Sequence, residues 1–257
     1  MKNITKLFIT ELRRGKSQVG DLMIHTSHTE IINNIHRLTV APKTHFEFNQ
    51  FLIIDEKTCL VHAGKEKLFE PLKKLVKKTL NGKKLDYIVF SHVEADESGA
   101  VNLWLTEYPQ AQVICNKIAN INLEDFLIRP AHILKDGELL NLGNRNLKLV
   151  ETPHFPHNWD AHMWYVPEDQ ILFSSDFCCQ GGICEPVMET DITPDIIDFY
   201  DKGQFIPYGK TTNEALKKIE ALPLKAIVPM HGSTILGNVC NYTFQTVKSD
   251  LVMRGNE

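Results

Sequence analysis

The stretch 91–97 concentrates side chains that could bind a metal ion. It directly follows an apolar run, 86–90, which has the length and composition of a buried strand. Imidazole nitrogen and carboxylate oxygen are ligands for metal ions of borderline or hard character. Within seven residues the chain places His92, Glu94, Asp96 and Glu97. A strand that ends in such a cluster predicts a metal site.

Further ligand-type side chains also stand just beyond strand-like runs, at His157, Asp176 and His231. Loops at strand ends often carry sites in α/β folds, because the sheet fixes the roots of the loops. We therefore expect these strand ends to meet the 91–97 stretch at one rim. Several carboxylates together are costly to bury unless a cation compensates their charge, which favours a metal centre over a purely structural cluster.

The donor types limit which metal could bind. No C-x-x-C pair occurs, so a thiolate zinc site has little support. Histidines combined with carboxylates favour iron, manganese or zinc, and the donor types alone do not choose among these.

The spacing of these residues resembles a known family. The series His92-x-Glu94-x-Asp96, then His157, Asp176 and His231-Gly232, resembles the metallo-β-lactamase-like fold and, within it, the flavodiiron proteins, whose first motif is H-x-E-x-D-H. Hydrolytic zinc members of the fold typically have H-x-H-x-D-H. The resemblance spans residues 35–235. A glutamate in place of an imidazole hardens the site and adds negative charge, so Glu94 favours iron over zinc.

The resemblance implies two iron ions, Fe2+ or Fe3+, with dioxygen as their ligand, and it gives each site residue a role. The first iron would be held by His92, Glu94 and His157. The second would be held by Asp96 and His231, with Asp176 bridging both. His157 is preferred over His154 because Asp160 and Tyr165 downstream fit the family's H-W-P-D-S-M-x-T-Y run.

Two departures from the family pattern shape the predicted function. Glu97 stands where the second iron normally receives a histidine, so that iron either takes a carboxylate or keeps an open position. The chain stops at Glu257, so we expect no flavodoxin domain and no FMN, and any electron donor would be separate. This combination resembles oxygen-binding diiron proteins that act as dioxygen sensors, in some bacteria beside chemotaxis receptors.

The leading hypothesis is therefore a diiron dioxygen sensor with a signalling partner. Three alternatives remain open: an oxygen or nitric oxide reductase fed by a separate electron donor, a binuclear zinc hydrolase, and a binding module that uses the lysine face of a helix at 66–80. The flavodiiron resemblance also makes a homodimer plausible.

Composition narrows the class of protein. Apolar residues make up 43% of the 257 residues and charged residues 23%, which is ordinary for a globular domain. The net charge of −4 gives no reason to expect nucleic acid, and no run is long enough to span a membrane. The N-terminus lacks the apolar core of a signal peptide, so we expect a cytoplasmic protein with six free thiols. Cys178 and Cys179, close to Asp176, could sense redox state, although inert thiols are the simpler interpretation.

The elements that must position the site follow from hydrophobic periodicity. Strands are expected at 35–40, 48–54, 59–63, 86–90, 111–115, 137–142, 147–151, 162–166, 170–174 and 225–229, the first three as an antiparallel meander. Helices are expected at 6–13, 66–80, 98–105, 121–128, 194–201 and 213–222. The predicted architecture is an α/β (αββα) sandwich, in which two mixed sheets are flanked by helices. We expect it to form a single domain over residues 1–257. Five aromatic side chains could line the pocket, although packing in the core is the simpler interpretation of each. They are His45, Phe46, Phe48, Trp159 and Trp164.

Overall fold

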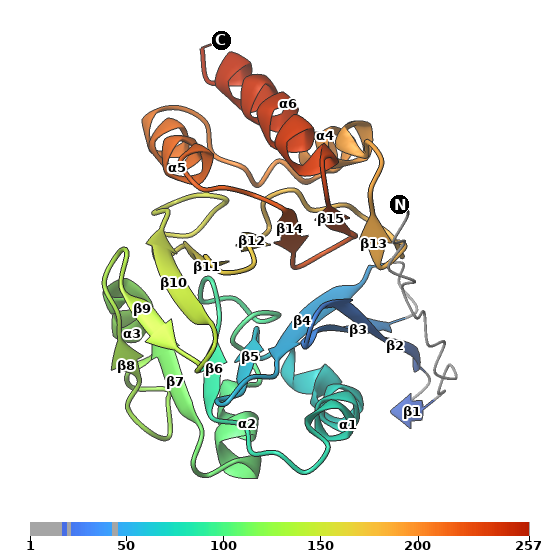
Figure 1. The fold of residues 1–257 in the computed structure, drawn as a ribbon, viewed down its shortest axis with the longest axis vertical. Coiled ribbons are helices and arrows are strands. Elements are labelled where there is room, and N and C mark those ends of the chain that lie inside the picture. The colour runs from blue at the N-terminus through green and yellow to red at the C-terminus, as the bar shows by residue number, and fades with distance from the viewer. Residues whose placement is uncertain (1–16, 20–21, 43–45, 257) are drawn as a thin grey trace, which may run out of the picture.

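The computed structural model describes residues 17–19, 22–42 and 46–256. Two β-sheets lie face to face, and helices cover the outer side of each (Figure 1). The predicted αββα sandwich of two mixed sheets flanked by helices is therefore confirmed. The helix expected at 6–13 and His45 lie outside the described residues.

The first sheet is built from the earlier part of the chain. Its strands, in spatial order, are β1 (Ser17–Val19), β2 (Leu22–Ile32), β3 (Ile35–Pro42), β4 (Phe48–Ile53), β5 (Cys59–Val61), β6 (Tyr87–Val89), β7 (Gln112–Cys115) and β8 (His132–Ile133). Pairing is antiparallel from β1 to β5 and parallel from β5 to β8. The antiparallel meander expected from residue 35 onward is confirmed.

The second sheet follows in the chain. Its strands, in spatial order, are β13 (Val187–Met188), β15 (Thr234–Leu236), β14 (Ala226–Pro229), β12 (Ile171–Ser175), β11 (His162–Val166), β10 (Asn146–Glu151) and β9 (Leu139–Asn141). The strands from β9 to β12 pair antiparallel, and β12 then pairs parallel with β14. This parallel pairing aligns the carboxyl ends of β12 and β14, each of which leads into a predicted ligand.

Helices close both outer faces. On the first sheet they are η1 (Glu66–Leu68), α1 (Phe69–Leu80), α2 (Val101–Glu107) and α3 (Lys117–Leu123), and on the second α4 (Thr193–Gly203), α5 (Lys210–Glu220) and α6 (Val239–Arg254) (Figure 1). None of the helices in the described residues has the length and apolar character needed to cross a bilayer.

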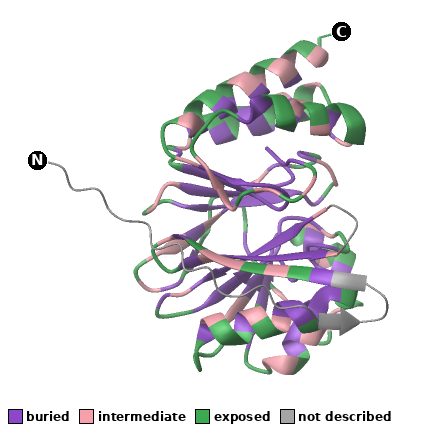
Figure 2. Cartoon of the chain, turned by 90° about the vertical axis from the view of Figure 1, so that its right-hand side faces the viewer, coloured by how far each residue is buried: buried purple, intermediate pink, exposed green. Residues whose placement is uncertain are grey.

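Three apolar clusters hold the four layers together. Side chains alternate across a strand, so each strand of a covered sheet supplies two of these clusters. In β4, Leu52 packs toward the helices of the first sheet, whereas Phe51 and Ile53 pack between the sheets. In β12, Leu172 packs toward α4–α6 and Phe173 packs between the sheets. Figure 2 shows the buried residues concentrated on the sheets and on the inner faces of the helices.

Several elements differ from the expectations. The helix expected at 121–128 begins at Lys117, because the Asn116 side chain accepts a hydrogen bond of 2.8 Å from the backbone N–H of Ala119 and so caps the helix earlier. The strands β1, β2, β8, β13 and β15 and the helix α6 were not anticipated. The stretch 25–29 in β2 is polar, and the hydrophobic pattern along α6 is weak, so neither gives a clear periodic signal.

Candidate metal centre

The predicted ligands lie in loops that follow four strands. The loop after β6 carries residues 91–97, the loop after β10 carries His157, and β12 and β14 lead into Asp176 and His231. One of these strands belongs to the first sheet and three belong to the second. The structure therefore assembles the cluster across the junction between the two sheets.

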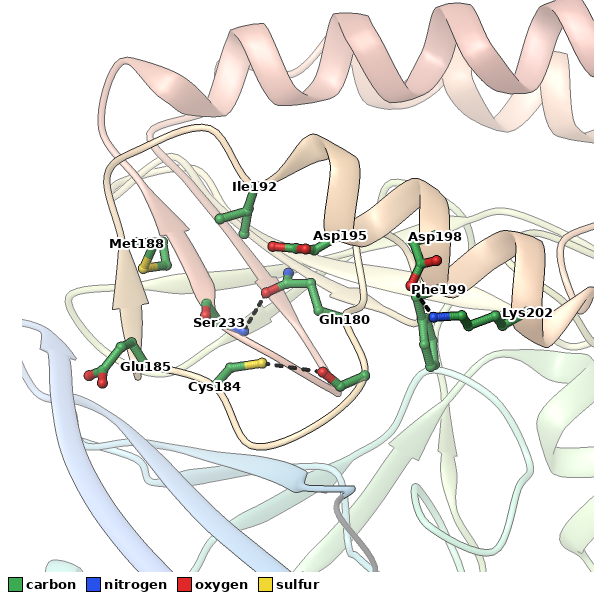
Figure 3. A pocket seen from close by; sticks show the side chains of 11 residues that line it. Gln180, Cys184, Glu185, Met188, Ile192, Asp195, Asp198, Phe199, Lys202 and Ser233 are labelled. Carbon is green, nitrogen blue, oxygen red and sulfur yellow. Dashed lines mark hydrogen bonds and ion pairs between the residues drawn. The ribbon is translucent and has the colours of Figure 1, made fainter.

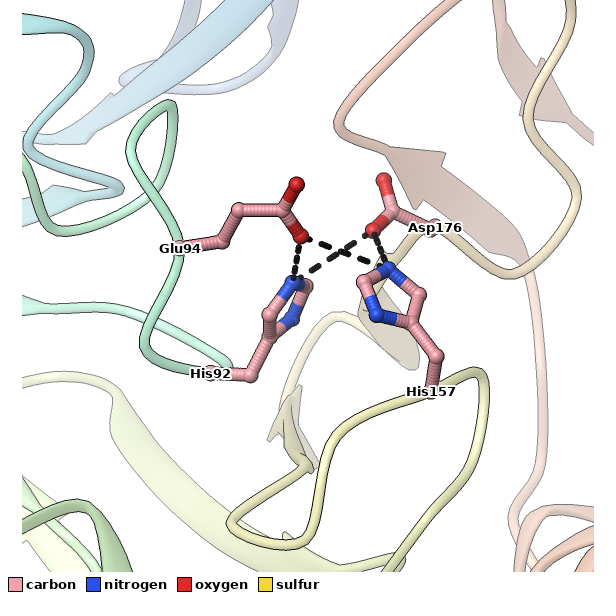
Figure 4. A group of neighbouring side chains, drawn as sticks. All are labelled: His92, Glu94, His157 and Asp176. Carbon is pink, nitrogen blue, oxygen red and sulfur yellow. Dashed lines mark hydrogen bonds and ion pairs between the residues drawn. The ribbon is translucent and has the colours of Figure 1, made fainter. Parts of the chain in front are cut away.

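Four of the side chains form a tight group (Figure 4). One donor atom from each of His92, Glu94, His157 and Asp176 lies within 4.8 Å of the others. His92 Nε2 is 2.9 Å from Glu94 Oε2, and His157 Nε2 is 2.8 Å from Asp176 Oδ2. Separations of this size are typical of neighbouring ligands around one metal ion.

A second group continues from the first through Asp176. His231 Nε2 lies 3.4 Å from Asp176 Oδ1 and 3.6 Å from Asp96 Oδ2. The other oxygen of Asp176, Oδ2, faces His157 and lies 3.6 Å from His92 Nε2. The Asp176 carboxylate thus stands between two groups of ligand-type side chains, with one oxygen toward each.

All three histidines face the cluster with the same ring nitrogen. Their Nδ1 atoms contact other protein groups: Ser175 Oγ at 3.1 Å for His92, Asn158 Oδ1 at 3.1 Å for His157, and the Glu47 carbonyl oxygen at 2.8 Å for His231. Metal-binding histidines generally use the second nitrogen in this way, which fixes the ring and its tautomer. The donor set therefore fits metal ions bound through three Nε2 atoms and the carboxylates.

The electrostatics of the cluster favour added positive charge. Burial lowers the pKa of His92, but Glu97, Glu94 and Asp176 outweigh it and raise that pKa to about 10. Burial raises the pKa of Asp96, and the nearby carboxylates add to that effect. Burial also acts to raise the pKa of Asp176, yet the surrounding histidines hold it below its ordinary range. Carboxylates crowded in this way are stabilised by a cation.

Glu97 faces away from this group of donors. Its Oε2 accepts hydrogen bonds from the backbone N–H groups of Ser91 at 2.6 Å and His92 at 2.9 Å. Its Oε1 accepts one from the Ser175 hydroxyl at 2.6 Å and lies 3.4 Å from His92 Nδ1, on the side of the ring opposite Nε2. His62 Nε2 lies 3.6 Å from the same oxygen and, with His92, holds the pKa of the buried Glu97 below its usual value although burial acts to raise it.

A row of phenylalanine rings covers both halves of the centre. The ring centroid of Phe46 lies 4.2 Å from that of His231, and the centroid of Phe205 lies 5.6 Å from that of His157. Phe199 of α4 stands between them, 5.9 Å from Phe46 and 5.6 Å from Phe205. We call Phe46, Phe199 and Phe205 the aromatic wall. Phe199 and Phe205 were not identified from the sequence, where only the helix that carries Phe199 was predicted.

The other aromatic candidates divide between the centre and the core. Phe48 contacts His231, with 5.3 Å between ring centroids. Trp164 is buried between the sheets and donates its indole N–H to the Phe90 carbonyl, so it is a core residue. Trp159 is 54% exposed, so it is not part of a buried wall around the cluster. His154 is also exposed, whereas His157 lies in the cluster.

The cysteines are all free, as expected. Cys179 lies against the centre, with Sγ 3.6 Å from Asp176 Oδ1. Burial raises the pKa of the Cys178 and Cys179 thiols well above the ordinary value, which keeps them protonated and poorly reactive. This favours the inert interpretation of the pair over redox sensing.

A cavity of about 490 Å³ lies beyond the aromatic wall, beneath α4 (Figure 3). Phe199 lines it, and so do Gln180 and Ser233, which follow Asp176 and His231 in the chain. The Gln180 side chain accepts a hydrogen bond from the Ser233 backbone N–H at 3.1 Å, which joins the two ligand loops at this point.

Comparison with known proteins points to one family. A family profile described as "ODP family beta lactamase" matches residues 46–232. A nitric oxide reductase from Moorella thermoacetica is 30% identical over 199 residues, which cover 72% of this chain and 48% of the relative. The chain spans about half the length of these curated relatives.

Solved structures show the same fold. The flavodiiron protein from Giardia intestinalis superposes with a TM-score of 0.77 at 20% identity, over 85% of this chain and 58% of that one. The rubredoxin oxygen:oxidoreductase from Desulfovibrio gigas gives a TM-score of 0.76 at 21% identity, over 87% and 61%. The expectation that FMN plays no part finds no support among relatives named as flavoproteins.

Proposed function

The chain belongs to the ODP family of beta-lactamase-like proteins, and we propose that it holds two iron ions which reduce dioxygen or nitric oxide with electrons from a separate donor. The observation that carries the proposal is the position of the Asp176 carboxylate. One of its oxygens faces His157 and the other faces His231. A carboxylate placed in this way is suited to bridge two metal ions.

The proposed ligands divide into two sets. His92, Glu94 and His157 would hold one iron, Asp96 and His231 the other, and Asp176 both. When bound, the two ions supply one electron each and a Lewis-acidic position for a diatomic molecule. The chain's own contribution is to fix the Nε2 atoms toward the centre through Ser175, Asn158 and the Glu47 carbonyl.

Iron is favoured over zinc by the ligand at Glu94. A carboxylate oxygen at this place is a harder donor than imidazole and better supports a ferric charge. Metal analysis of protein grown with ample iron tests the choice. Two iron per chain and a change in the visible spectrum on anaerobic reduction and re-oxygenation are expected, whereas two zinc and no spectral change would overturn the diiron proposal and favour a binuclear zinc site.

The aromatic wall supports a small, weakly polar substrate. Phe46, Phe199 and Phe205 place apolar surface over both histidines at the outer side of the centre. Dioxygen and nitric oxide pass such apolar surface easily, because neither carries a charge that would have to be desolvated. Relatives named as a nitric oxide reductase and a rubredoxin oxygen:oxidoreductase support reduction as the reaction.

A dioxygen sensor is the second candidate, because of the way Glu97 is held. Its carboxylate is occupied by two backbone N–H groups and a hydroxyl, so the second iron would have only Asp96, His231 and Asp176 from the chain. Fewer ligands leave room for a bound diatomic molecule. In the sensor this molecule would persist and a signalling protein would respond to it.

Oxygen consumption separates the two candidates. Iron-loaded protein is supplied with reduced rubredoxin and a rubredoxin reductase, and consumption of dioxygen and of nitric oxide is followed. Sustained turnover on the order of 1–10³ s⁻¹ is expected for the reductase, which is the common range for enzymes. A single turnover followed by a stable spectral band would support the sensor and exclude the reductase.

A further inference from the structure

A buried ion pair lies behind His231, on the side away from the proposed metals. Arg37 in β3 and Glu47 just before β4 pair through Nη2 and Oε1, and their side chains are 1% and 2% exposed. Arg37 lies in a strand of the first sheet and Glu47 directly precedes another, whereas His231 follows β14 of the second sheet. The function proposed above gives this pair no role.

Both members of the pair reach the loop that carries His231. Arg37 Nη2 donates to the carbonyl oxygen of Gly232 at 3.0 Å. The backbone carbonyl of Glu47 lies 2.8 Å from His231 Nδ1 and accepts a hydrogen bond from it. The imidazole and the next peptide group are therefore both held by the ion pair and its backbone.

A neighbouring amide strengthens the same attachment. Asn49 Nδ2 donates to the Gly232 carbonyl at 2.9 Å, and the Asn49 backbone N–H donates to the Met230 carbonyl at 2.8 Å. The Thr39 hydroxyl donates to Asn49 Oδ1 at 2.8 Å, which sets the direction of the amide. Three consecutive residues, 230–232, are thus bound by groups from β3 and β4.

Stability alone does not explain the ion pair. Buried ion pairs lose much of their Coulombic gain to desolvation, and apolar residues of similar volume often replace them without loss of stability. Arg37 Nε also has no hydrogen-bond partner among the described residues, which adds to the cost. The contacts that apolar side chains could not reproduce are those to the His231 loop.

We infer that Arg37 and Glu47 are positioning residues that orient His231 for the second metal of the proposed centre. The inference rests on the proposed two-metal function. His231 is the single imidazole assigned to that metal, whose other ligands are carboxylates. Loss of the orientation should therefore weaken the second site selectively, while His92 and His157, which contact neither Arg37 nor Glu47 among the described residues, keep the first.

The test is a titration of the metal-free full chain with Co2+. We expect two equivalents to bind to the wild type. The double variant Arg37→Met/Glu47→Met removes the Arg37 bond to the Gly232 carbonyl and leaves the backbone carbonyl of Glu47 in the chain. It should stay folded, bind the first equivalent with unchanged affinity, and bind the second about 10-fold more weakly, the lower end of the effect of disturbing the groups that orient a metal ligand. Two equivalents at wild-type affinity in the folded double variant would overturn the inference.

A matched control removes an ion pair elsewhere. Arg145 and Asp169 pair at the opposite end of β10 from His157, and Arg145→Met/Asp169→Leu should leave both affinities unchanged. If the Arg37 and Glu47 variant does not fold, Arg37→Lys replaces it, because lysine keeps a positive charge opposite Glu47 but lacks the guanidinium whose Nη2 bonds both Glu47 and the Gly232 carbonyl. Selective weakening of the second site is again expected, and unchanged binding contradicts the inference.

A measurement without metal separates this inference from the proposed function. In the metal-free wild type, imidazole 15N spectra should show His231 protonated at Nδ1, and in the double variant this tautomer should no longer dominate. A wild type that shows the tautomer yet binds fewer than two metals refutes the two-metal function. If His231 has the same tautomer in the wild type and in the double variant, the positioning role is refuted even where two metals bind.

Discussion

At the scale of single residues, Glu97 shows how a residue of the ligand motif can serve a different role. The resemblance left two possibilities for it, coordination or an open metal position. In the structure its two oxygens are taken by Ser91, His92 and Ser175. The Ser175 hydroxyl donates to Glu97 and lies against His92 Nδ1, so Glu97 orients the ring of a proposed ligand through Ser175.

The substitution Glu97→Gln distinguishes an anchor from a ligand. The amide keeps the size of the side chain but removes its charge. The hydrogen bonds that the carboxylate accepts in the wild type are therefore weakened, and each hydrogen bond to a charged group contributes about 1.5–3 kcal/mol. We expect the free energy of unfolding in urea to fall by about 2–3 kcal/mol while two metals still bind. Loss of one metal with unchanged stability would show that Glu97 is a ligand.

The choice of His157 over His154 gives a matched pair of variants. His157 Nε2 is 2.8 Å from Asp176, whereas His154 is exposed. His157→Ala should lower the affinity for the first metal by at least about 10-fold, and His154→Ala should leave it unchanged. Iron content after gel filtration measures both. The reverse result would move the ligand to His154.

At the scale of elements, the turn after β14 depends on glycine. Gly232 has φ +88°, and a Cβ there would lie 2.9 Å from the backbone nitrogen and from the side chain of Gln180. Gly237 has φ +84° but open space around it. The two positions therefore share the backbone conformation and differ in packing.

Alanine substitutions at the two glycines separate these effects. Gly237→Ala should cost only the left-handed strain, about 1–2 kcal/mol of unfolding free energy. Gly232→Ala adds the clash with Gln180, so we expect a loss at least about 1 kcal/mol larger, together with a weaker second metal site. Urea denaturation and Co2+ titration measure the two quantities. Equal losses would mean that the Gln180 loop moves aside at no cost.

The elements also show where prediction from the sequence succeeds. Most strands and helices on which the site depends have clear periodicity, and the ligands stand at their ends. The partners of Nδ1 could not be predicted, because Ser175, Asn158 and the Glu47 carbonyl become neighbours of the histidines only through tertiary packing. The same holds for Phe199 and Phe205, which nothing in the local sequence connects with His157 or His231. α6 has no clear apolar stripe, although Phe244, Val247 and Leu251 are buried.

At the scale of the whole molecule, the proposed centre joins the two sheets. His92, Glu94 and Asp96 come from the loop after β6 of the first sheet, and His157, Asp176 and His231 come from the second. Metal bound there should therefore stabilise the packing of the sheets and not only the loops. In the metal-free chain, repulsion among the carboxylates acts in the opposite direction.

Removal of the metal should be visible as lost stability. A ligand that binds only the folded state at about 100 times its Kd adds about 2.7 kcal/mol. We expect the thermal midpoint of the metal-free chain to rise on addition of Fe2+ under anaerobic conditions and to fall again with a chelator. Asp176→Asn, which alters the carboxylate shared by both sets of ligands, should abolish most of the rise. A midpoint insensitive to Fe2+ would contradict a centre that joins the sheets.

The order of the two sheets along the chain has a consequence for biosynthesis. The described strands of the first sheet end at Ile133, and those of the second begin at Leu139. A nascent chain therefore completes one sheet of the sandwich well before the other exists. Three proposed ligands emerge early from the ribosome, and His231 emerges last, more than a hundred residues later. The proposed metal centre can thus be completed only after translation has passed that histidine, and ribosome-bound chains halted before it would carry an incomplete and exposed set of carboxylates.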